Sequence, residues 1–219
     1  MMWSDGLFEE LESLGDGKMA VGMAAYMKNQ FKFLGVPTPV RRKVSRKYFQ
    51  LARGLKAPDF DFVDRCYASD YREFQYVAVN YLQASVDLLK AGDMAAIELL
   101  ITTKSWWDTV DGLDNVAGRL AEKYPSLIKR ILAWSQAEDF WLRRAAIDHQ
   151  LYRKEKTDPG LLEKIIINNL GQKEFFINKA IGWALREFSK TDPAWVGDFI
   201  GRHRAELSKL SLREVSKYL

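Results

Sequence analysis

A recurrence of about 34 residues constrains the fold of this chain more than any other feature of its sequence. Prolines mark it at Pro125, Pro159 and Pro193, and the same interval separates Pro58 from Gly92. Each marker opens a helical pattern, because proline suits the first turn of a helix. A second helical pattern begins about fifteen residues after each marker. Helix pairs that cannot bury their apolar faces alone must stack on one another, so the recurrence predicts an all-α solenoid.

The expected helices divide the chain into a regular and a less regular stretch. We expect the first helices of the repeats at residues 60–67, 94–101, 127–134, 161–167 and 195–200, and the second helices to begin near Tyr71, Ser105, Phe140 and Glu174. In the less regular residues 1–56 we expect helices near 6–13, 17–33 and 39–53. The period matches tetratricopeptide repeats, but their sequence signature is missing. We therefore predict a HEAT-like array with a concave binding groove, and one continuous domain over residues 1–219.

The composition excludes several classes of protein. No stretch reaches the eighteen or more apolar residues of a membrane span, and the acidic start of the chain is unlike a secretory signal. We therefore expect a cytoplasmic protein. A single cysteine, Cys66, excludes an internal disulfide and a thiolate metal cluster. With only His149 and His203 as imidazoles, we expect no metal site and no histidine-based triad.

The charge of the chain is unevenly distributed. Residues 26–56 contain nine lysines and arginines and no acid, and Arg41 and Arg42 lie at the centre of this segment. Such a segment is either a solvated basic face or a track for a polyanion, since clustered cations gain affinity by displacing counterions from phosphates. The sequence leaves both interpretations open.

The second helices of three repeats share a register. If Trp107, Trp141 and Phe176 are taken as equivalent, the polar and aromatic residues at offsets 3, 4, 7 and 10 from them fall on one helical stripe. These residues are Asp111, Arg144, Lys179, Trp183 and Arg186. The stripe predicts a groove in which indole rings alternate with cations and one carboxylate.

Two ordinary explanations of this stripe stay open beside a functional one. Tryptophan at helical spacing is more often a core residue, and Asp111 and Arg144 could form an ion pair between adjacent helices. A basic groove with aromatic rings instead suits nucleic acid. A carboxylate such as Asp111 makes sense there if positive charge develops nearby, as it does on a sugar when a glycosidic bond breaks.

At these residues the chain resembles the AlkD-type DNA alkylation repair family of HEAT-like-repeat glycosylases. The resemblance covers essentially the whole chain, and its most specific runs are residues 26–39, 103–111, 141–146, 174–187 and 207–214. It implies a monofunctional DNA glycosylase that releases positively charged N3- and N7-alkylated purines, such as 3-methyladenine and 7-methylguanine, from duplex DNA in base excision repair. It further implies that the damaged base does not enter a protein pocket.

The resemblance also implies roles for individual residues. Asp111 corresponds to the catalytic carboxylate, and Trp107 and Trp183 correspond to two indoles that contact the deoxyribose of the lesion. DNA-contacting positions of the family fall on Arg144, Tyr26 and Arg186, to which the charge pattern adds Lys179, Arg41 and Arg42. Tyr152 departs from the family because we expect a lysine there; Arg153 and Lys154 could replace that contact.

The expected partner is therefore double-stranded DNA containing alkylated purines, bound without cofactor or metal. We expect a monomer with no membrane association and no obligate protein partner, located in the bacterial cytosol with the nucleoid. The alternatives are a non-catalytic HEAT-repeat protein that recognises distorted duplex DNA, and a protein-interaction scaffold, which is the commonest use of helical repeats.

Overall fold

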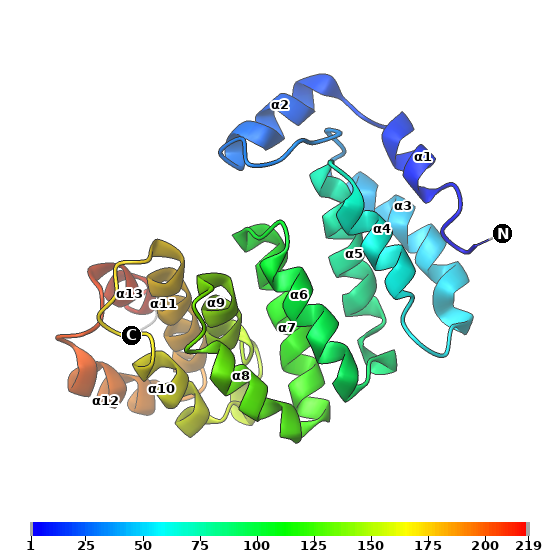
Figure 1. The fold of residues 1–219 in the computed structure, drawn as a ribbon. Coiled ribbons are helices and arrows are strands. Elements are labelled where there is room, and N and C mark those ends of the chain that lie inside the picture. Colours follow the sequence, from blue (N-terminus) through cyan, green and yellow to red (C-terminus); the bar gives the residue numbers. More distant parts are fainter. Residues whose placement is uncertain (1, 218–219) are drawn as a thin grey trace. The chain divides into compact units, whose positions relative to one another are not determined.

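The computed structural model describes residues 2–217, and within them the chain is all-α. No β-strand occurs in this range; one isolated bridge pairs Lys32 with Tyr71. The chain divides into two compact units, one ending at Leu89 and the other beginning at Lys90 (Figure 1). The helical fold class is thus confirmed, whereas the organisation into one continuous domain stays a prediction.

The first unit contains five α-helices and two 3₁₀ helices within the described residues. They are α1 (Leu7–Ser13), α2 (Gly17–Tyr26), α3 (Thr38–Leu51), α4 (Phe60–Ala68) and α5 (Arg72–Ala84), with 3₁₀ helices at Ala52–Gly54 and Val86–Leu88. Helix α3 packs on α1 and α5, and α4 packs on α5.

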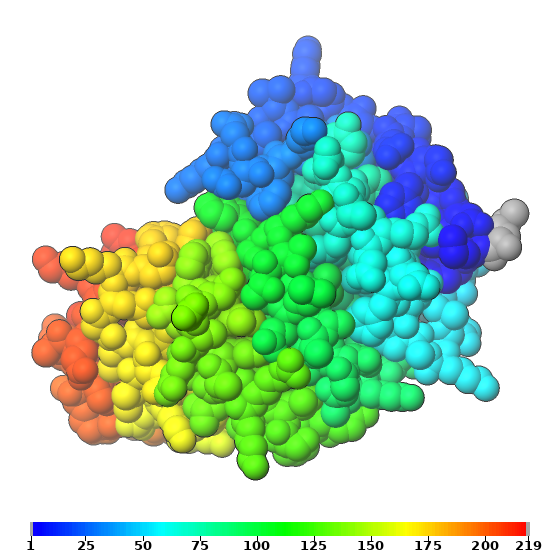
Figure 2. Space-filling model, in the orientation of Figure 1, coloured from blue at the N-terminus to red at the C-terminus, as the bar shows by residue number. Residues whose placement is uncertain are grey.

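The second unit consists of four consecutive helix pairs. They are α6 (Met94–Thr102) with α7 (Trp107–Lys123), α8 (Ile128–Trp134) with α9 (Phe140–Asp148), α10 (Pro159–Ile167) with α11 (Phe175–Ser189), and α12 (Pro193–His203) with α13 (Lys209–Val215). Short 3₁₀ helices lie at Ala91–Asp93, Pro125–Leu127 and Lys154–Lys156. The second helices pack in series, α7 on α9, α9 on α11 and α11 on α13. Figure 2 shows the outer surface that the side chains of this unit form on one face, coloured from green to red along the sequence.

Proline and a preceding acid begin two of the predicted helices. Pro159 and Pro193 are the first residues of α10 and α12. The side chains of Asp158 and Asp192 accept hydrogen bonds from backbone N–H groups that have no partner within the first turn. Pro125 differs, because it opens a 3₁₀ helix that leads into α8 at Ile128.

The helix expected at residues 17–33 is shorter than the sequence indicated. It ends at Tyr26, because Lys28 and Asn29 adopt φ angles of 54° and 57° in the left-handed region, where an α-helix cannot continue. The loop that follows is fixed by Glu73 of α5. Its buried carboxylate accepts hydrogen bonds from the backbone N–H groups of residues 34–36 at 3.0, 2.9 and 3.2 Å.

Glycine is required in that loop. Gly35 has a φ of 88°, and a Cβ atom added to it would lie 2.0 Å from the carbonyl oxygen of Asp16. The loop therefore passes the start of α2 so closely that no residue with a Cβ atom could replace Gly35.

None of the described helices combines the length and the apolarity that crossing a membrane requires.

Candidate active site

An ion pair between α7 and α9 lies at the centre of the candidate site. Arg144 donates from Nε to Oδ1 of Asp111 at 2.8 Å and from Nη2 to Oδ2 at 2.9 Å. Its Nη1 donates to the carbonyl oxygen of Phe176 on α11 at 2.8 Å. The Arg144 side chain is 1% exposed, whereas that of Asp111 is 26% exposed. A bidentate pair of this kind fixes the plane of the carboxylate as well as its position.

The ion pair between Asp111 and Arg144, which the sequence left open, is therefore present. It changes the role expected for Arg144, which was a contact with DNA. A buried guanidinium engaged with a carboxylate and a backbone carbonyl is placed to orient Asp111. Its burial argues against a direct contact with a phosphate.

Two further carboxylates, from Asp114 and Asp148, lie next to this pair. One oxygen of each, together with one of Asp111, falls within a set whose members are all within 4.8 Å of one another. Asp148 Oδ2 is 3.7 Å from Nη2 of Arg144, and neither oxygen of Asp148 has a hydrogen-bond partner among the described residues. The register of the stripe did not reveal either residue, although Asp148 follows Arg144 by one helical turn.

Burial controls the protonation of this cluster. It raises the pKa of Asp148 to about 7, against the attraction of Arg144, and it raises the pKa of Asp114 well above its usual value, helped by the charges of Asp111 and Asp148. Burial also raises the pKa of Asp111, but the charge of Arg144 and its hydrogen bonds oppose this increase. Because Asp111 alone has the bidentate pair, the negative charge of the cluster concentrates on it.

Three carboxylates supply the oxygen donors that Mg²⁺ and Ca²⁺ use. Here, however, Arg144 already provides a cation for two of them, since it lies 2.8 Å from Asp111 and 3.7 Å from Asp148. The cluster therefore resembles a charge-compensated carboxylate site more than a metal site.

A cavity of about 160 Å³ opens beside the cluster. Its walls include Asp111, Asp114, Asp148 and, from α11, the ring of Trp183. Trp107 is half-buried one helical turn before Asp111 and is not part of the cavity wall. Of the two indoles expected to contact the lesion, Trp183 thus lines the same cavity as Asp111, whereas Trp107 lies on the same helix as Asp111.

Three cations surround the Trp183 ring. The guanidinium carbon of Arg144 and Nζ of Lys179 both lie 5.4 Å from the ring centroid, and the guanidinium carbon of Arg186 lies 5.8 Å from it. These distances are within the range of cation–π attraction. The stripe predicted from the register is therefore assembled around Trp183.

Glu214 of α13 holds two of these cations, a role that the sequence did not indicate. Its carboxylate accepts hydrogen bonds from Lys179 at 2.8 Å, from Arg186 at 3.0 Å and from Lys217 at 2.9 Å. The hydrogen bond from Lys179 is the main reason that the pKa of Glu214 falls to about 2. Gly182 permits this approach, since a Cβ atom on it would lie 2.6 Å from Cβ of Glu214.

An aromatic cluster lies beneath the ion pair. Trp141, which shares the register of Trp107, is buried, whereas Trp107 and Trp183, for which the core interpretation stayed open, are both half-buried. Its ring centroid is 5.8 Å from that of Trp106 and 4.8 Å from that of Phe176. Phe176, whose carbonyl oxygen accepts the hydrogen bond from Arg144, thus packs in this aromatic cluster, although it is itself half-buried.

The other predicted contact residues differ in accessibility. Tyr26 is 72% exposed and Arg42 is exposed, but Arg41 is buried, with its guanidinium carbon 4.4 Å from the centroid of the Tyr76 ring. The burial of Arg41 argues against a phosphate contact from it.

Tyr152, at the position where a lysine was expected, is exposed and lines the cavity beside Trp183. Arg153, the suggested replacement, donates from Nη2 to the carbonyl oxygen of Gly118. Lys154 is exposed. Of the two suggested replacements, Lys154 is thus the more accessible.

Comparisons with known proteins identify the family of the chain. The family model described as DNA alkylation repair enzyme matches residues 7–219. No curated protein matches the sequence. A solved structure described as a predicted DNA alkylation repair enzyme from Enterococcus faecalis is similar to the chain, with a TM-score of 0.86 and 37% sequence identity over 94% of this chain and 96% of that one. The chain therefore belongs to the DNA alkylation repair enzyme family.

Proposed function

We propose that this protein is a monofunctional DNA glycosylase that excises positively charged N3- and N7-alkylated purines from duplex DNA. The observation that carries the proposal is the Asp111 carboxylate, partly exposed at a cavity and held in a fixed orientation by the buried Arg144. A preorganised anion of this kind stabilises positive charge that develops next to it in a transition state.

The chemistry of the substrate explains why so few groups are needed. A purine alkylated at N3 or N7 already carries a positive charge, so its departure requires no protonation by the enzyme. The demand falls on the deoxyribose, which becomes oxocarbenium-like as the C1′–N bond breaks. In this mechanism Asp111 stabilises that sugar cation and orients a water molecule towards C1′.

Trp107 and Trp183 are proposed to contact the same sugar. The negative face of an indole ring attracts a cation, so a sugar that becomes positive gains from contact with both rings. Such contacts are stronger in the transition state than in the ground state, which is the condition for catalysis. Arg186 and Lys179, which lie beside Trp183, are proposed to meet the phosphates that flank the lesion.

Release of free base tests this function. Purified protein is incubated with duplex DNA containing 7-methylguanine, and the released base is quantified. We expect release by the wild-type protein and a loss of about 10²-fold or more for Asp111→Asn, since removing one preorganised electrostatic group costs that much. Duplex binding should be retained or tighter, because a negative charge that faces phosphates has been removed.

The matched control is Asp198→Asn, which removes an exposed carboxylate of the same unit. It should leave base release unchanged. Equal release by Asp111→Asn and wild type would remove Asp111 from the mechanism. Duplex binding without any base release by the wild type would favour the non-catalytic DNA-binding protein instead.

A further inference from the structure

One buried carboxyl group of the second unit, that of Asp148, has no part in the mechanism proposed above. Asp148 is 1% exposed, and neither of its oxygens has a hydrogen-bond partner among the described residues. Buried polar groups are normally hydrogen-bonded, because an unpaired one is costly. A carboxyl group kept in such a position therefore calls for an explanation in the chemistry of its surroundings.

The ion pair next to Asp148 has no net charge. Asp111 and Arg144 carry opposite unit charges and lie 2.8 Å apart, so together they are neutral. The electrostatic potential of a neutral pair decreases faster with distance than that of a single charge. Arg144 therefore orients Asp111 but also weakens the attraction that this carboxylate exerts on a nearby cation.

Asp148 is placed to restore a net negative charge. Its Oδ2 lies 3.7 Å from Nη2 of Arg144, and one of its oxygens lies within 4.8 Å of an oxygen of Asp111. Asp148 also lines the cavity that Asp111 and Trp183 line. The charge of a buried group is screened by salt much less than that of an exposed one. When Asp148 is ionised, the two carboxylates and Arg144 together carry one negative charge.

The surroundings of Asp148 make its ionisation sensitive to pH near neutrality. Burial raises the pKa of Asp148 to about 7, and the attraction of Arg144 opposes this increase. Helix α11 contributes the uncharged ring of Trp183 to the cavity wall, and α6, α8 and α10, which also pack on α9, contribute no described residue to it. The charged and titratable side chains around Asp148 are Arg144 of its own helix, Asp111 and Asp114 of α7, and Tyr152 in the cavity wall. Among these neighbours, Asp148 thus changes its charge near pH 7.

We propose that Asp148 is a positioning residue of the candidate active site, whose ionised carboxylate touches no substrate but gives the neutral pair of Asp111 and Arg144 a net negative charge. A sugar that becomes positive next to Asp111 is then stabilised by two carboxylates instead of one. Protonation of Asp148 at lower pH removes this second charge. The identity of the cation as a deoxyribose rests on the proposed function.

The expected size of the effect follows from the distances. A sugar that contacts Asp111 lies within roughly 8 Å of Asp148, since one oxygen of each carboxylate lies within 4.8 Å of the other. At this distance and an effective dielectric constant of about 20, a full unit charge changes a rate by on the order of 30-fold. A transition state carries part of a charge, so we expect a change on the order of 10-fold.

The pH dependence of base release tests the proposal. The single-turnover rate constant for release of 7-methylguanine from duplex DNA is measured with the whole chain in excess, for the wild type and Asp148→Asn, from about pH 5.5 to about pH 8.5. Asparagine has the shape of a protonated aspartate and cannot ionise. The ratio of the wild-type to the variant rate constant should be about 1 at the low end of this range and on the order of 10 at the high end. The substrate is the same for both proteins, so its own titration cancels in the ratio.

A purely structural role for Asp148 gives a different result. Loss of packing would lower the rate constant by the same factor at every pH, and such a constant ratio would overturn the proposal. So would a pH dependence that persists in Asp148→Asn and disappears in Asp114→Asn, because the titrating group would then be Asp114. Agreement of the two rate constants at low pH would show that Asp148→Asn is folded.

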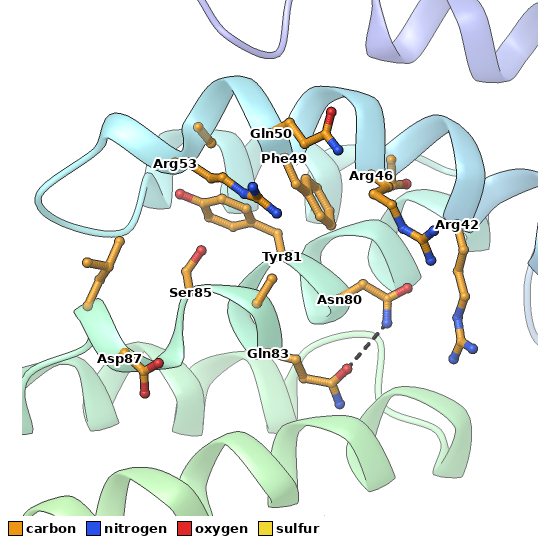
Figure 3. Close-up of a pocket in the computed structure, with 14 residues that line it drawn as sticks. Arg42, Arg46, Phe49, Gln50, Arg53, Asn80, Tyr81, Gln83, Ser85 and Asp87 are labelled. Carbon is orange, nitrogen blue, oxygen red and sulfur yellow. Dashed lines mark hydrogen bonds between the residues drawn. The ribbon is translucent and has the colours of Figure 1, made fainter.

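Asp87→Asn is the matched control. Asp87 also lines a cavity, the opening of about 620 Å³ between α3 and α5 of the first unit, but it is exposed (Figure 3). Its replacement removes one negative charge from a carboxylate that solvent screens. The ratio of rate constants for this variant should stay near 1 at every pH. A rise equal to that for Asp148→Asn would overturn the proposal, since the net charge of the protein would then control the rate.

A binding measurement separates this proposal from the glycosylase function. Duplex DNA is prepared with a pyrrolidine, whose ring nitrogen is positively charged, in place of one deoxyribose, and with a neutral tetrahydrofuran as the reference. The preference of the wild type for the charged ring should rise on the order of 10-fold between the same pH limits, and that of Asp148→Asn should not rise. Without this rise in the wild type the proposal fails, even if base is released. A rise without any base release would support the role of Asp148 and argue against the glycosylase function.

Discussion

Replacement of Asp148 by asparagine should change the pH dependence of stability in a defined direction. Asp148 is 1% exposed, and burial raises its pKa from 3.8 to about 7. Between these two values the folded protein keeps a proton that the unfolded chain has lost. The free energy of unfolding therefore falls as pH rises through this window, and it levels off above about pH 7.

The size of the effect follows from the two pKa values. One pH unit corresponds to about 1.36 kcal/mol, so the whole difference amounts to about 4 kcal/mol. About 3 kcal/mol of it is lost between pH 5 and pH 8, which is an accessible range for measurement. Asparagine cannot ionise, so the variant lacks this contribution. Its buried amide costs about 1–3 kcal/mol at every pH if it finds no partner.

Urea unfolding at several pH values from 5 to 8 measures this difference. Relative to the wild type, Asp148→Asn should gain about 3 kcal/mol between pH 5 and pH 8, whatever its offset at pH 5. Asp64→Asn is the control, because Asp64 is exposed and its curve should run parallel to that of the wild type. Parallel curves for Asp148→Asn and wild type would refute the idea that Asp148 stores a proton in the folded state.

Two further predictions concern packing around the same site. Arg144→Gln should lower the free energy of unfolding, measured in urea, by about 3–5 kcal/mol, because it leaves buried carboxylates without their cation. Arg202→Gln is the control: it breaks exposed ion pairs and should lower the free energy of unfolding by less than about 1 kcal/mol. Similar losses for both variants would contradict the argument. Gly118→Ala should lower the unfolding temperature, with a cost of about 1–3 kcal/mol, because its Cβ atom would lie 2.0 Å from the carbonyl oxygen of His149. Gly197→Ala, with nothing within 4 Å, should be neutral or slightly stabilising, because alanine favours the helix more than glycine does. An unfolding temperature as low as that of Gly118→Ala would contradict the packing argument.

Local signals in the sequence were sufficient for the helix pairs. Pro159 and Pro193, each preceded by an acid, begin helices because both effects act within one turn of the chain. The end of α2 at Tyr26 could not be predicted in this way. The left-handed conformations of Lys28 and Asn29 depend on a loop that is held by Glu73, far along the chain.

The candidate site was predictable in part, because spacing along a helix is a local signal. Helical register was enough to place Asp111, Arg144 and Trp183 on one face. It could not show that Arg144 is buried, because burial depends on the packing of neighbouring helices. Glu214 was missed because α13 meets α11 only in the folded protein. Asp148, one turn after Arg144, carried a signal that inspection of charge spacing within α9 could have found.

The hydrogen bond from Arg144 to the carbonyl oxygen of Phe176 makes the orientation of the Asp111 carboxylate depend on a neighbouring aromatic cluster. The ring of Phe176 is wedged against Trp106 and Trp141, so a change of volume in any of these three rings would displace the carbonyl and tilt the guanidinium that aligns Asp111. In a glycosylase that acts through Asp111 as proposed, volume-altering substitutions in this aromatic cluster would then behave as active-site mutations, lowering turnover even where the folded protein remains abundant.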